Sequence, residues 1–245
     1  DEFVVYYQVK VSNEGEVVGV EALIRWEHPE FGLVMPNEFI PIAEQGGKIT
    51  AITRWIIKQV CIDMPDLKQW ALTPFRASIN LSGHDLRSNQ LFDYIYNTFN
   101  LYDINPENVE FEVTESAYLE NFALSNKFFR RIANMGCAIA LDDFGTGYSS
   151  LSYLTQINID TLKVDRQFVT ELQTSERSRL VTGAIIDLAK RLSLSVCAEG
   201  IENHEQWDYL REHGCDNVQG FLFSKPIPLS ALVRSPCRYD ASAMA

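Results

Sequence analysis

The pattern of hydrophobic and polar residues divides the chain into eight strand-like segments with helical patterns between them. The first two segments, residues 3–11 and 17–25, flank a turn at residues 12–16 that contains Asn-Glu-Gly, which predicts an antiparallel hairpin. Six more strand-like segments follow, at about 75–81, 108–114, 136–142, 159–165, 194–199 and 215–220.

The helical patterns between the strands decide the fold class. The clearest apolar stripe follows helical spacing, at Leu180, Ala184, Ile185, Leu188 and Leu192. Other helical patterns run over residues 50–67, 121–135 and 203–213. Because strands that alternate with helices form parallel sheets, we expect an α/β fold. Eight strands favour a modified (β/α)8 TIM-like barrel, in which the N-terminal hairpin makes one strand antiparallel.

The length of the chain fits this interpretation. A chain of 245 residues is enough for one barrel, which we place at residues 1–234. The last segment, 235–245, reads SPCRYDASAMA and predicts a flexible C-terminal tail. The chain opens at Asp1 without an initiator methionine, so we expect a domain from a longer protein that carries regulatory domains. It contains no run of about 18 apolar residues that would cross a membrane.

Charge narrows the range of partners. The formal net charge is −12, with 33 acidic and 21 basic residues. A field of this sign disfavours the binding of DNA or RNA duplexes through a basic patch. A ligand that carries phosphate would need local help from cations.

The cysteines indicate the compartment. None of the five forms a CxxC pair, and two lie within apolar strand-like segments, where a cysteine is usually a small buried hydrophobe. This usage suits a reducing cytoplasm, with neither a disulfide framework nor a thiolate zinc site. The five are Cys61, Cys137, Cys197, Cys215 and Cys237.

Seven of the eight strand-like segments carry a polar residue toward their ends. In a (β/α)8 barrel, catalytic groups gather at the carboxyl ends of the strands. One acid at a strand end is more often a helix cap or a partner in a surface ion pair, but seven strands with the same feature predict a shared site. The residues are Glu21, Asn80, Glu112, Asp142 with Asp143, Lys163, Glu199 and Gln219.

The stretch CAIALDDFGTGYSSL suggests what this site binds. Asp142 and Asp143 are adjacent carboxylates that repel each other unless cations bind between them. Oxygen ligands from Asp, Glu and Asn favour Mg²⁺ or Mn²⁺ over zinc. A carboxylate that bridges two ions about 3.5–4 Å apart is typical of two-metal phosphoester hydrolases. Arg25 has the same strand parity as Glu21, so we expect it to reach a phosphate from the same wall.

The sequence also resembles a known family. Glu21-Ala22-Leu23 is the signature tripeptide of the EAL domain family of cyclic di-GMP phosphodiesterases. The resemblance covers roughly residues 3–232, and its blocks occur in the order expected of the family. They read EALIRW, NLS, FEVTES, DDFGTGYSSL, LKVDRQFV, AEGIE and QGFLFSKP.

The resemblance implies a role for each polar residue. It implies hydrolysis of one phosphodiester bond of cyclic di-GMP to linear pGpG, with two Mg²⁺ or Mn²⁺ ions per site, in a homodimer. The implied metal ligands are Glu21, Asn80, Glu112, Asp142 as the bridge, Asp143 and Glu199.

Further roles follow from the same resemblance. Lys163 would hold or deprotonate the attacking water. We interpret it as a cation that orients the water, because a lysine with an ordinary pKa is protonated at pH 7. Catalysis would also involve Glu199 and Gln219, and the substrate contacts would be Arg25, Leu23 and Gln8. The residues that anchor the DFGTG loop and couple it to the dimer would be Glu115 and Thr146.

Three functional hypotheses differ in how much of the sequence they explain. An active phosphodiesterase uses every residue of the set. A silent cyclic di-GMP receptor, or a protein-interaction module on the same fold, would usually lack a metal ligand or carry an altered DFGTG loop. A sugar hydrolase needs two carboxylates and leaves the aspartate pair and Lys163 unexplained. One departure from many relatives, Val9 where they have proline, affects the strand edge near Gln8 rather than the metal site.

Overall fold

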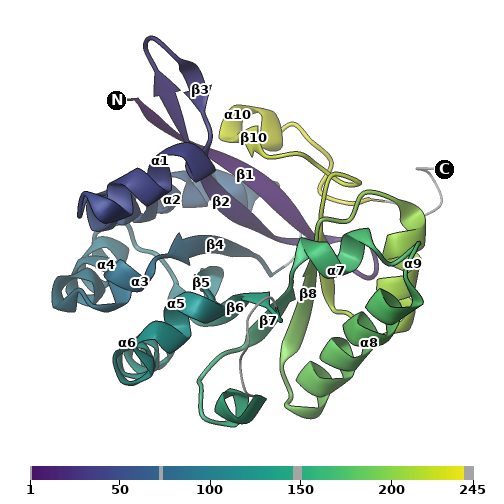
Figure 1. Cartoon of the computed structure of the whole chain (residues 1–245). Coiled ribbons are helices and arrows are strands. Elements are labelled where there is room, and N and C mark those ends of the chain that lie inside the picture. Colours follow the sequence, from purple (N-terminus) through teal and green to yellow (C-terminus); the bar gives the residue numbers. More distant parts are fainter. Residues whose placement is uncertain (1, 72–73, 146–150, 240–245) are drawn as a thin grey trace.

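Eight strands close into a barrel at the centre of the molecule (Figure 1). The computed structural model describes residues 2–71, 74–145 and 151–239. The barrel strands are β1 (Phe3–Ser12), β2 (Val17–His28), β4 (Arg76–Leu81), β5 (Val109–Thr114), β6 (Ala138–Phe144), β7 (Thr161–Val164), β8 (Ser195–Glu199) and β9 (Asn217–Gln219).

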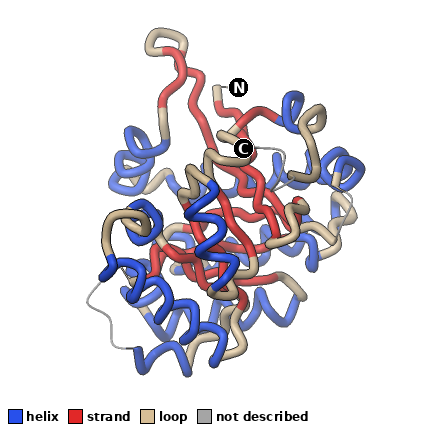
Figure 2. The backbone as a smooth tube through the Cα atoms, turned by 90° about the vertical axis from the view of Figure 1, so that its right-hand side faces the viewer, coloured by secondary structure: helices blue, strands red, loops and turns tan. Residues whose placement is uncertain are grey.

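The strand directions confirm the expected barrel. β1 pairs antiparallel with both β2 and β9, and it closes a sheet in which every other neighbouring pair of barrel strands is parallel. We call the amino ends of the parallel strands the lower end and their carboxyl ends the upper end. Two short strands that the sequence analysis missed, β3 (Gly32–Val34) and β10 (Ile227–Pro228), pair antiparallel with β2 and β1. The β2–β3 hairpin projects from the barrel (Figures 1 and 2).

Helices surround the strands (Figure 2). The four expected helices are present as α2, α6, α8 and α9. None of the helices in the described ranges combines the length and hydrophobicity needed to cross a membrane. The α-helices are α1 (Pro36–Gln45), α2 (Ile49–Trp70), α3 (Gly83–Leu86), α4 (Asn89–Leu101), α5 (Glu115–Glu120), α6 (Phe122–Met135), α7 (Arg166–Thr170), α8 (Glu176–Arg191), α9 (His204–Glu212) and α10 (Leu229–Leu232), and the 3₁₀ helices are Pro106–Asn108 and Leu151–Thr155.

The predicted face of α8 is wrong at its first two positions, Leu180 and Ala184, which are both exposed. Leu180 is 69% exposed, whereas Ile185 and Ala189 are buried against the barrel. Thr182, three residues before Ile185, is also buried. Each residue of an α-helix turns by about 100°, so Leu180 lies on the side of α8 away from this buried face.

The two faces of the barrel strands differ in polarity. The outward residues, such as Phe111, Ile139 and Val196, are fully buried in the apolar layer between strands and helices. The inward residues include many polar side chains, and those of β5 are Glu110 and Glu112. Because alternate residues of a strand point to opposite faces, the strands bury an apolar core on one side and a polar site on the other.

Part of the expected C-terminal tail makes hydrogen bonds to the rest of the domain. Trp70 Nε1 donates to the carbonyl oxygen of Ser235 at 3.0 Å, and Tyr239 N donates to the carbonyl oxygen of Gly15 at 2.7 Å. Gly15 has φ of +81°, and a Cβ there would lie 1.9 Å from Tyr239 O. Residues of the segment 235–239 thus contact both α2 and the β1–β2 turn, and the flexibility of the tail stays a prediction. Residues 240–245 lie outside the described residues.

Candidate active site

Lys163 lies at the centre of an acidic cluster at the upper end of the barrel. We define this cluster as Glu21, Glu112, Asp142, Asp143 and Glu199. The Lys163 side chain is fully buried, and its Nζ lies 2.9 Å from Asp142 Oδ2 and 2.6 Å from Glu199 Oε1.

Two further members of the cluster complete the surroundings of Lys163. Lys163 also forms a hydrogen-bonded ion pair with Glu112 Oε2 and lies 3.9 Å from Glu21 Oε2. These acids come from β2, β5, β6 and β8. The fold therefore brings together acids that are far apart in the sequence, as predicted from the ends of the strands.

The charges in this site shift the pKa values in opposite directions. Burial lowers the pKa of Lys163, but the carboxylates of Asp142, Glu112, Glu199 and Glu21 raise it by more, to well above its ordinary value. Lys163 is therefore protonated at neutral pH. Burial raises the pKa of Glu112, yet the ammonium groups of Lys10 and Lys163 outweigh it and lower this pKa to about 2. Burial raises the pKa of Glu199 to about 8 despite its contact with Lys163.

The adjacent aspartates break the regular alternation of β6. Asp143 has φ of +54°, which is rare outside glycine, and the β6–β7 register shifts between Leu141 and Phe144. The backbone N–H of Asp143 donates to Asp142 Oδ1 at 2.8 Å. Burial, then repulsion from Asp142 and Asp165, raises the pKa of Asp143 to about 6. The strained turn thus holds two neighbouring carboxylates near one another at the end of a buried strand.

Amide side chains connect the acidic cluster to β1 and β9. Asn80 Nδ2 donates to Glu21 Oε1 at 2.7 Å, and Gln219 Nε2 donates to Glu21 Oε2 at 2.6 Å. Gln219 Nε2 also donates to Gln8 Oε1 at 3.0 Å, and Gln8 Nε2 donates to the carbonyl oxygen of Ser224 at 2.9 Å. Gln219 Oε1 is buried without a hydrogen-bond partner among the described residues. This amide oxygen is available to accept a hydrogen bond from a water molecule.

A cavity of about 280 Å³ opens over the acidic cluster. Its lining includes Gln8 and Leu23, together with three residues that the sequence analysis missed, Arg166, Glu202 and Phe221. Arg166 Nη2 lies 2.8 Å from Glu202 Oε1 at the rim. Arg166 lies within the block LKVDRQFV and Glu202 ends the block AEGIE, so membership of those blocks was an available signal.

The three proposed substrate contacts have different surroundings. Leu23 lines both this cavity and a neighbouring apolar cavity of about 280 Å³. Arg25 is buried, donates to the carbonyl oxygen of Ile24 at 2.7 Å, and lies with its guanidinium carbon 5.6 Å from the centre of the Tyr6 ring. Of the three, Gln8 and Leu23 border the acidic cavity, and Arg25 stands farther along the same face of β2.

Glu115 links two segments near the DFGTG loop. Its Oε2 accepts a hydrogen bond from Gly145 N at 3.2 Å, and its Oε1 accepts one from the hydroxyl of Tyr153. The Glu115 side chain is buried, so these donors compensate its loss of hydration. Thr146, the other residue assigned to this loop, lies outside the described residues.

The donor set suits a hard divalent cation, although its arrangement is not that of a ready metal site. The cluster and Asn80 offer only carboxylate and amide oxygens, the ligands that Mg²⁺ and Mn²⁺ prefer. In residues 2–71, 74–145 and 151–239, no three Asp, Glu, His or Cys side chains are arranged so that they could hold a metal ion. The ammonium of Lys163 lies among the carboxylates instead. Metal binding therefore requires these side chains to rearrange, and it stays a prediction.

Comparison with known proteins identifies the family. The model of the EAL domain matches residues 1–226. The chain belongs to the EAL domain family. The cyclic di-GMP phosphodiesterase NbdA of Pseudomonas aeruginosa is 38% identical over 99% of this chain, and the cyclic di-GMP phosphodiesterase PdeR of Escherichia coli is 36% identical over 98%. This EAL domain spans 31% and 36% of the lengths of those two proteins.

The fold agrees with solved EAL structures. The structure titled "PaMucR Phosphodiesterase, c-di-GMP complex" is 36% identical, with a TM-score of 0.90 and coverage of 94% of both chains. The cAMP- and cyclic-di-GMP-bound EAL enzyme Bd1971 is also 36% identical, with a TM-score of 0.90, and matches 96% of this chain and 64% of its own. The modified barrel expected from the sequence is thus confirmed.

Proposed function

We propose that this EAL domain is a phosphodiesterase that hydrolyses cyclic di-GMP to linear pGpG. The observation that supports this most directly is the buried acidic cluster around Lys163 at the upper end of the barrel. The relatives NbdA and PdeR, which match nearly the whole chain, are named cyclic di-GMP phosphodiesterases.

The proposed site holds two divalent cations, Mg²⁺ or Mn²⁺. When bound, such ions polarise phosphoryl oxygens and lower the pKa of a bound water molecule. They would also supply positive charge that a protein of net charge −12 otherwise lacks near a phosphate. The residues that would hold them are Glu21, Asn80, Glu112, Asp142, Asp143 and Glu199.

The side chains of this chain position the water and the substrate. Once the side chains have rearranged around the ions, protonated Lys163 would donate a hydrogen bond to the attacking water and orient it rather than remove its proton. Gln219, whose Oε1 lacks a protein donor, accepts a hydrogen bond from the same water. Glu199 lies 2.6 Å from Lys163 Nζ and holds that ammonium in place.

The cavities beside the cluster suit the rest of the dinucleotide. Cyclic di-GMP carries flat purine bases beside charged phosphodiesters, so it needs apolar and polar subsites side by side. Leu23 separates the acidic cavity from the apolar one, which is also lined by Pro36, Ile40 and Ile52. We assign a guanine base to the apolar cavity, the substrate edge to Gln8 and Leu23, and a phosphate to Arg25.

The homodimer and the regulatory domains stay predictions. The chain spans about a third of its curated relatives, so additional domains in the parent protein would explain the difference in length. Glu115 accepts hydrogen bonds from Gly145, within the DFGTG segment, and from Tyr153, which follows it, and these contacts support the proposed role of Glu115 in anchoring that loop.

The direct test is incubation of the purified chain with cyclic di-GMP in the presence of Mg²⁺, Mn²⁺ or EDTA, followed by chromatography of the nucleotides. We expect linear pGpG to form only with a divalent cation. If calorimetry shows binding of cyclic di-GMP but no tube shows cleavage, the domain is a receptor rather than an enzyme. Neither binding nor cleavage would favour a protein-interaction module on this fold.

A further inference from the structure

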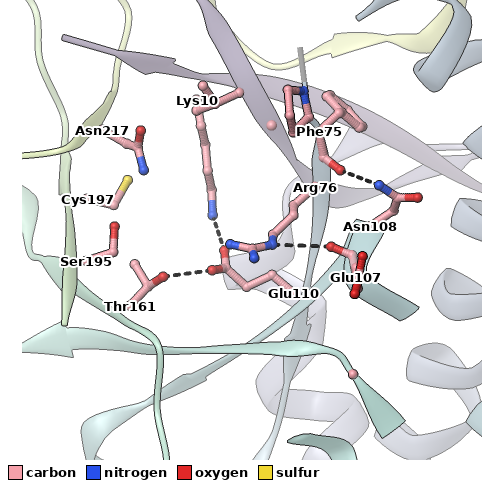
Figure 3. A pocket seen from close by; sticks show the side chains of 14 residues that line it. Lys10, Phe75, Arg76, Glu107, Asn108, Glu110, Thr161, Ser195, Cys197 and Asn217 are labelled. Carbon is pink, nitrogen blue, oxygen red and sulfur yellow. Dashed lines mark hydrogen bonds and ion pairs between the residues drawn. The ribbon is translucent and has the colours of Figure 1, made fainter. Parts of the chain in front are cut away.

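A second and larger cavity, of about 530 Å³, lies at the lower end of the barrel, opposite the acidic cluster. Figure 3 shows Lys10 extending from β1 into this region, with Glu110 at the tip of its side chain and Thr161 on the other side of that carboxylate. Lys10 is 6% exposed and Glu110 is 5% exposed. These two side chains separate the lower cavity from the interior of the barrel.

The hydrogen-bond donors of Lys10 all have acceptors among the polar groups around it. Lys10 Nζ donates to Ser78 Oγ at 2.6 Å, to Glu110 Oε2 at 2.8 Å and to Glu112 Oε1 at 2.5 Å, which uses all three of its protons. Glu110 also accepts from Ser78 Oγ at 2.8 Å and from Thr161 Oγ1 at 2.9 Å. We call Lys10, Ser78, Glu110 and Thr161 the lower network. Because its donors and acceptors are satisfied, it offers little to a ligand in the lower cavity.

The lower network reaches the proposed active site through one residue. Glu112 is fully buried, and two lysines hold its two oxygens from opposite sides. Lys10 holds Oε1 from the lower end, and Lys163 contacts Oε2 from the upper end. A carboxylate with each oxygen bound to a different ammonium cannot rotate without breaking a charged hydrogen bond.

We propose that Lys10 is a positioning residue for catalysis. By binding Oε1, it fixes the plane of the Glu112 carboxylate and leaves only Oε2 directed at the acidic cluster. Glu112 would then offer a divalent cation a single oxygen, the one that Lys163 contacts in this structure. This inference rests on the proposed function, because it assigns Lys10 to the support of one proposed metal ligand.

A purely structural role for Lys10 makes a different prediction. In that case Lys10 only balances the buried charge of Glu110, and removing both charges together should restore a normal protein. The double variant Lys10→Met/Glu110→Gln removes one positive and one negative charge, so it keeps the net charge and avoids leaving Glu110 unpaired. Glu110→Gln alone is the matched control, because it keeps the contact between Lys10 and Glu112.

The experiment measures Mn²⁺ affinity by calorimetry, and kcat and KM with cyclic di-GMP, for the wild type and the three variants. We expect the double variant to fold and to bind Mn²⁺ about 10- to 100-fold more weakly. Its kcat should fall by a larger factor than its KM changes. Glu110→Gln should keep its Mn²⁺ affinity within about threefold of the wild type. If Lys10→Met folds, it should resemble the double variant. If it does not fold, the double variant alone tests the proposal.

Two results would overturn proposals, and they are distinguishable. Wild-type Mn²⁺ affinity and kcat in the double variant would show that Lys10 only balances charge, while the proposed function would stand. A wild-type protein that neither binds Mn²⁺ nor hydrolyses cyclic di-GMP would instead remove the proposed function, and with it the role assigned to Lys10.

Discussion

The two ends of the barrel each bury one lysine, and the surroundings of the two lysines differ. Lys10 at the lower end contacts two carboxylates, and its protons and the oxygens of Glu110 are matched by partners. Lys163 at the upper end faces four carboxylates within 3.9 Å. Buried charges that are fully paired need no ligand to stabilise them, whereas an excess of one sign costs stability.

This difference teaches where to look for function. Removing several carboxylates from water and placing them together is unfavourable unless something binds to them. The larger cavity lies at the lower end, yet the unbalanced charge lies at the upper end. In this domain an excess of buried charge therefore marks the proposed active site, whereas the volume of a cavity does not.

The largest expected effect comes from removing one acid at the upper end. Glu21→Gln should reduce hydrolysis of cyclic di-GMP by about 10²- to 10³-fold, because a proposed metal ligand loses its charge. The free energy of unfolding should stay equal to that of the wild type or rise, since one repulsive charge is gone. Initial rates by chromatography and urea unfolding measure the two quantities. A rate close to that of the wild type would show that Glu21 is not part of the site.

A smaller and opposite effect is expected at the lower end. Glu110→Gln should lower the free energy of unfolding by about 1–3 kcal/mol, because Lys10 and Thr161 lose a charged acceptor. Hydrolysis should stay within about threefold of the wild type, since Lys10 still contacts Glu112. The same two assays apply. A loss of rate as large as that of Glu21→Gln, without a loss of stability, would erase the distinction between the two ends.

The smallest expected effect is a change of stability with pH that comes from two buried cysteine thiols near the lower end. Burial raises the pKa values of the Cys137 and Cys215 thiols, which precede β6 and β9, to about 12. Their folded pKa values exceed the unfolded value of about 9, so the neutral thiols stabilise the fold below that pH. This contribution is lost as the pH rises from about 9 toward 12, by about 1 kcal/mol per thiol at pH 10.

Urea unfolding at pH 8, 9 and 10 measures this loss. The variant Cys137→Ala, whatever its stability at pH 8, should show a shallower fall between pH 9 and 10 than the wild type. Equal slopes for the two proteins would mean that the Cys137 thiol ionises as readily in the folded chain as in the unfolded one.

Local sequence patterns were sufficient to predict the eight barrel strands and the positions of the acidic residues along them. Alternation along a strand is a short-range property, and the turn at residues 12–16 made the first pair antiparallel. The short strands β3 and β10 were not predicted, because segments of three and two residues are too short to show an alternation of apolar and polar positions. Leu180 and Ala184 were placed on the wrong face of α8, because apolar spacing alone does not show which side of a helix packs against the barrel.

The tertiary structure decided how the inward side chains meet. Lys10 and Glu112 are 102 positions apart, and only closure of the barrel between β1 and its neighbours brings Lys10 beneath Glu112. Long-range packing likewise places Lys163 among its carboxylates and Tyr239 against Gly15, and it forms the cavities at the two ends of the barrel. The sequence by itself determined which side chains point inward, because that depends on neighbours along one strand. Which inward side chains lie at the same height in the barrel and contact one another depends on the register between strands, and long-range packing sets that register.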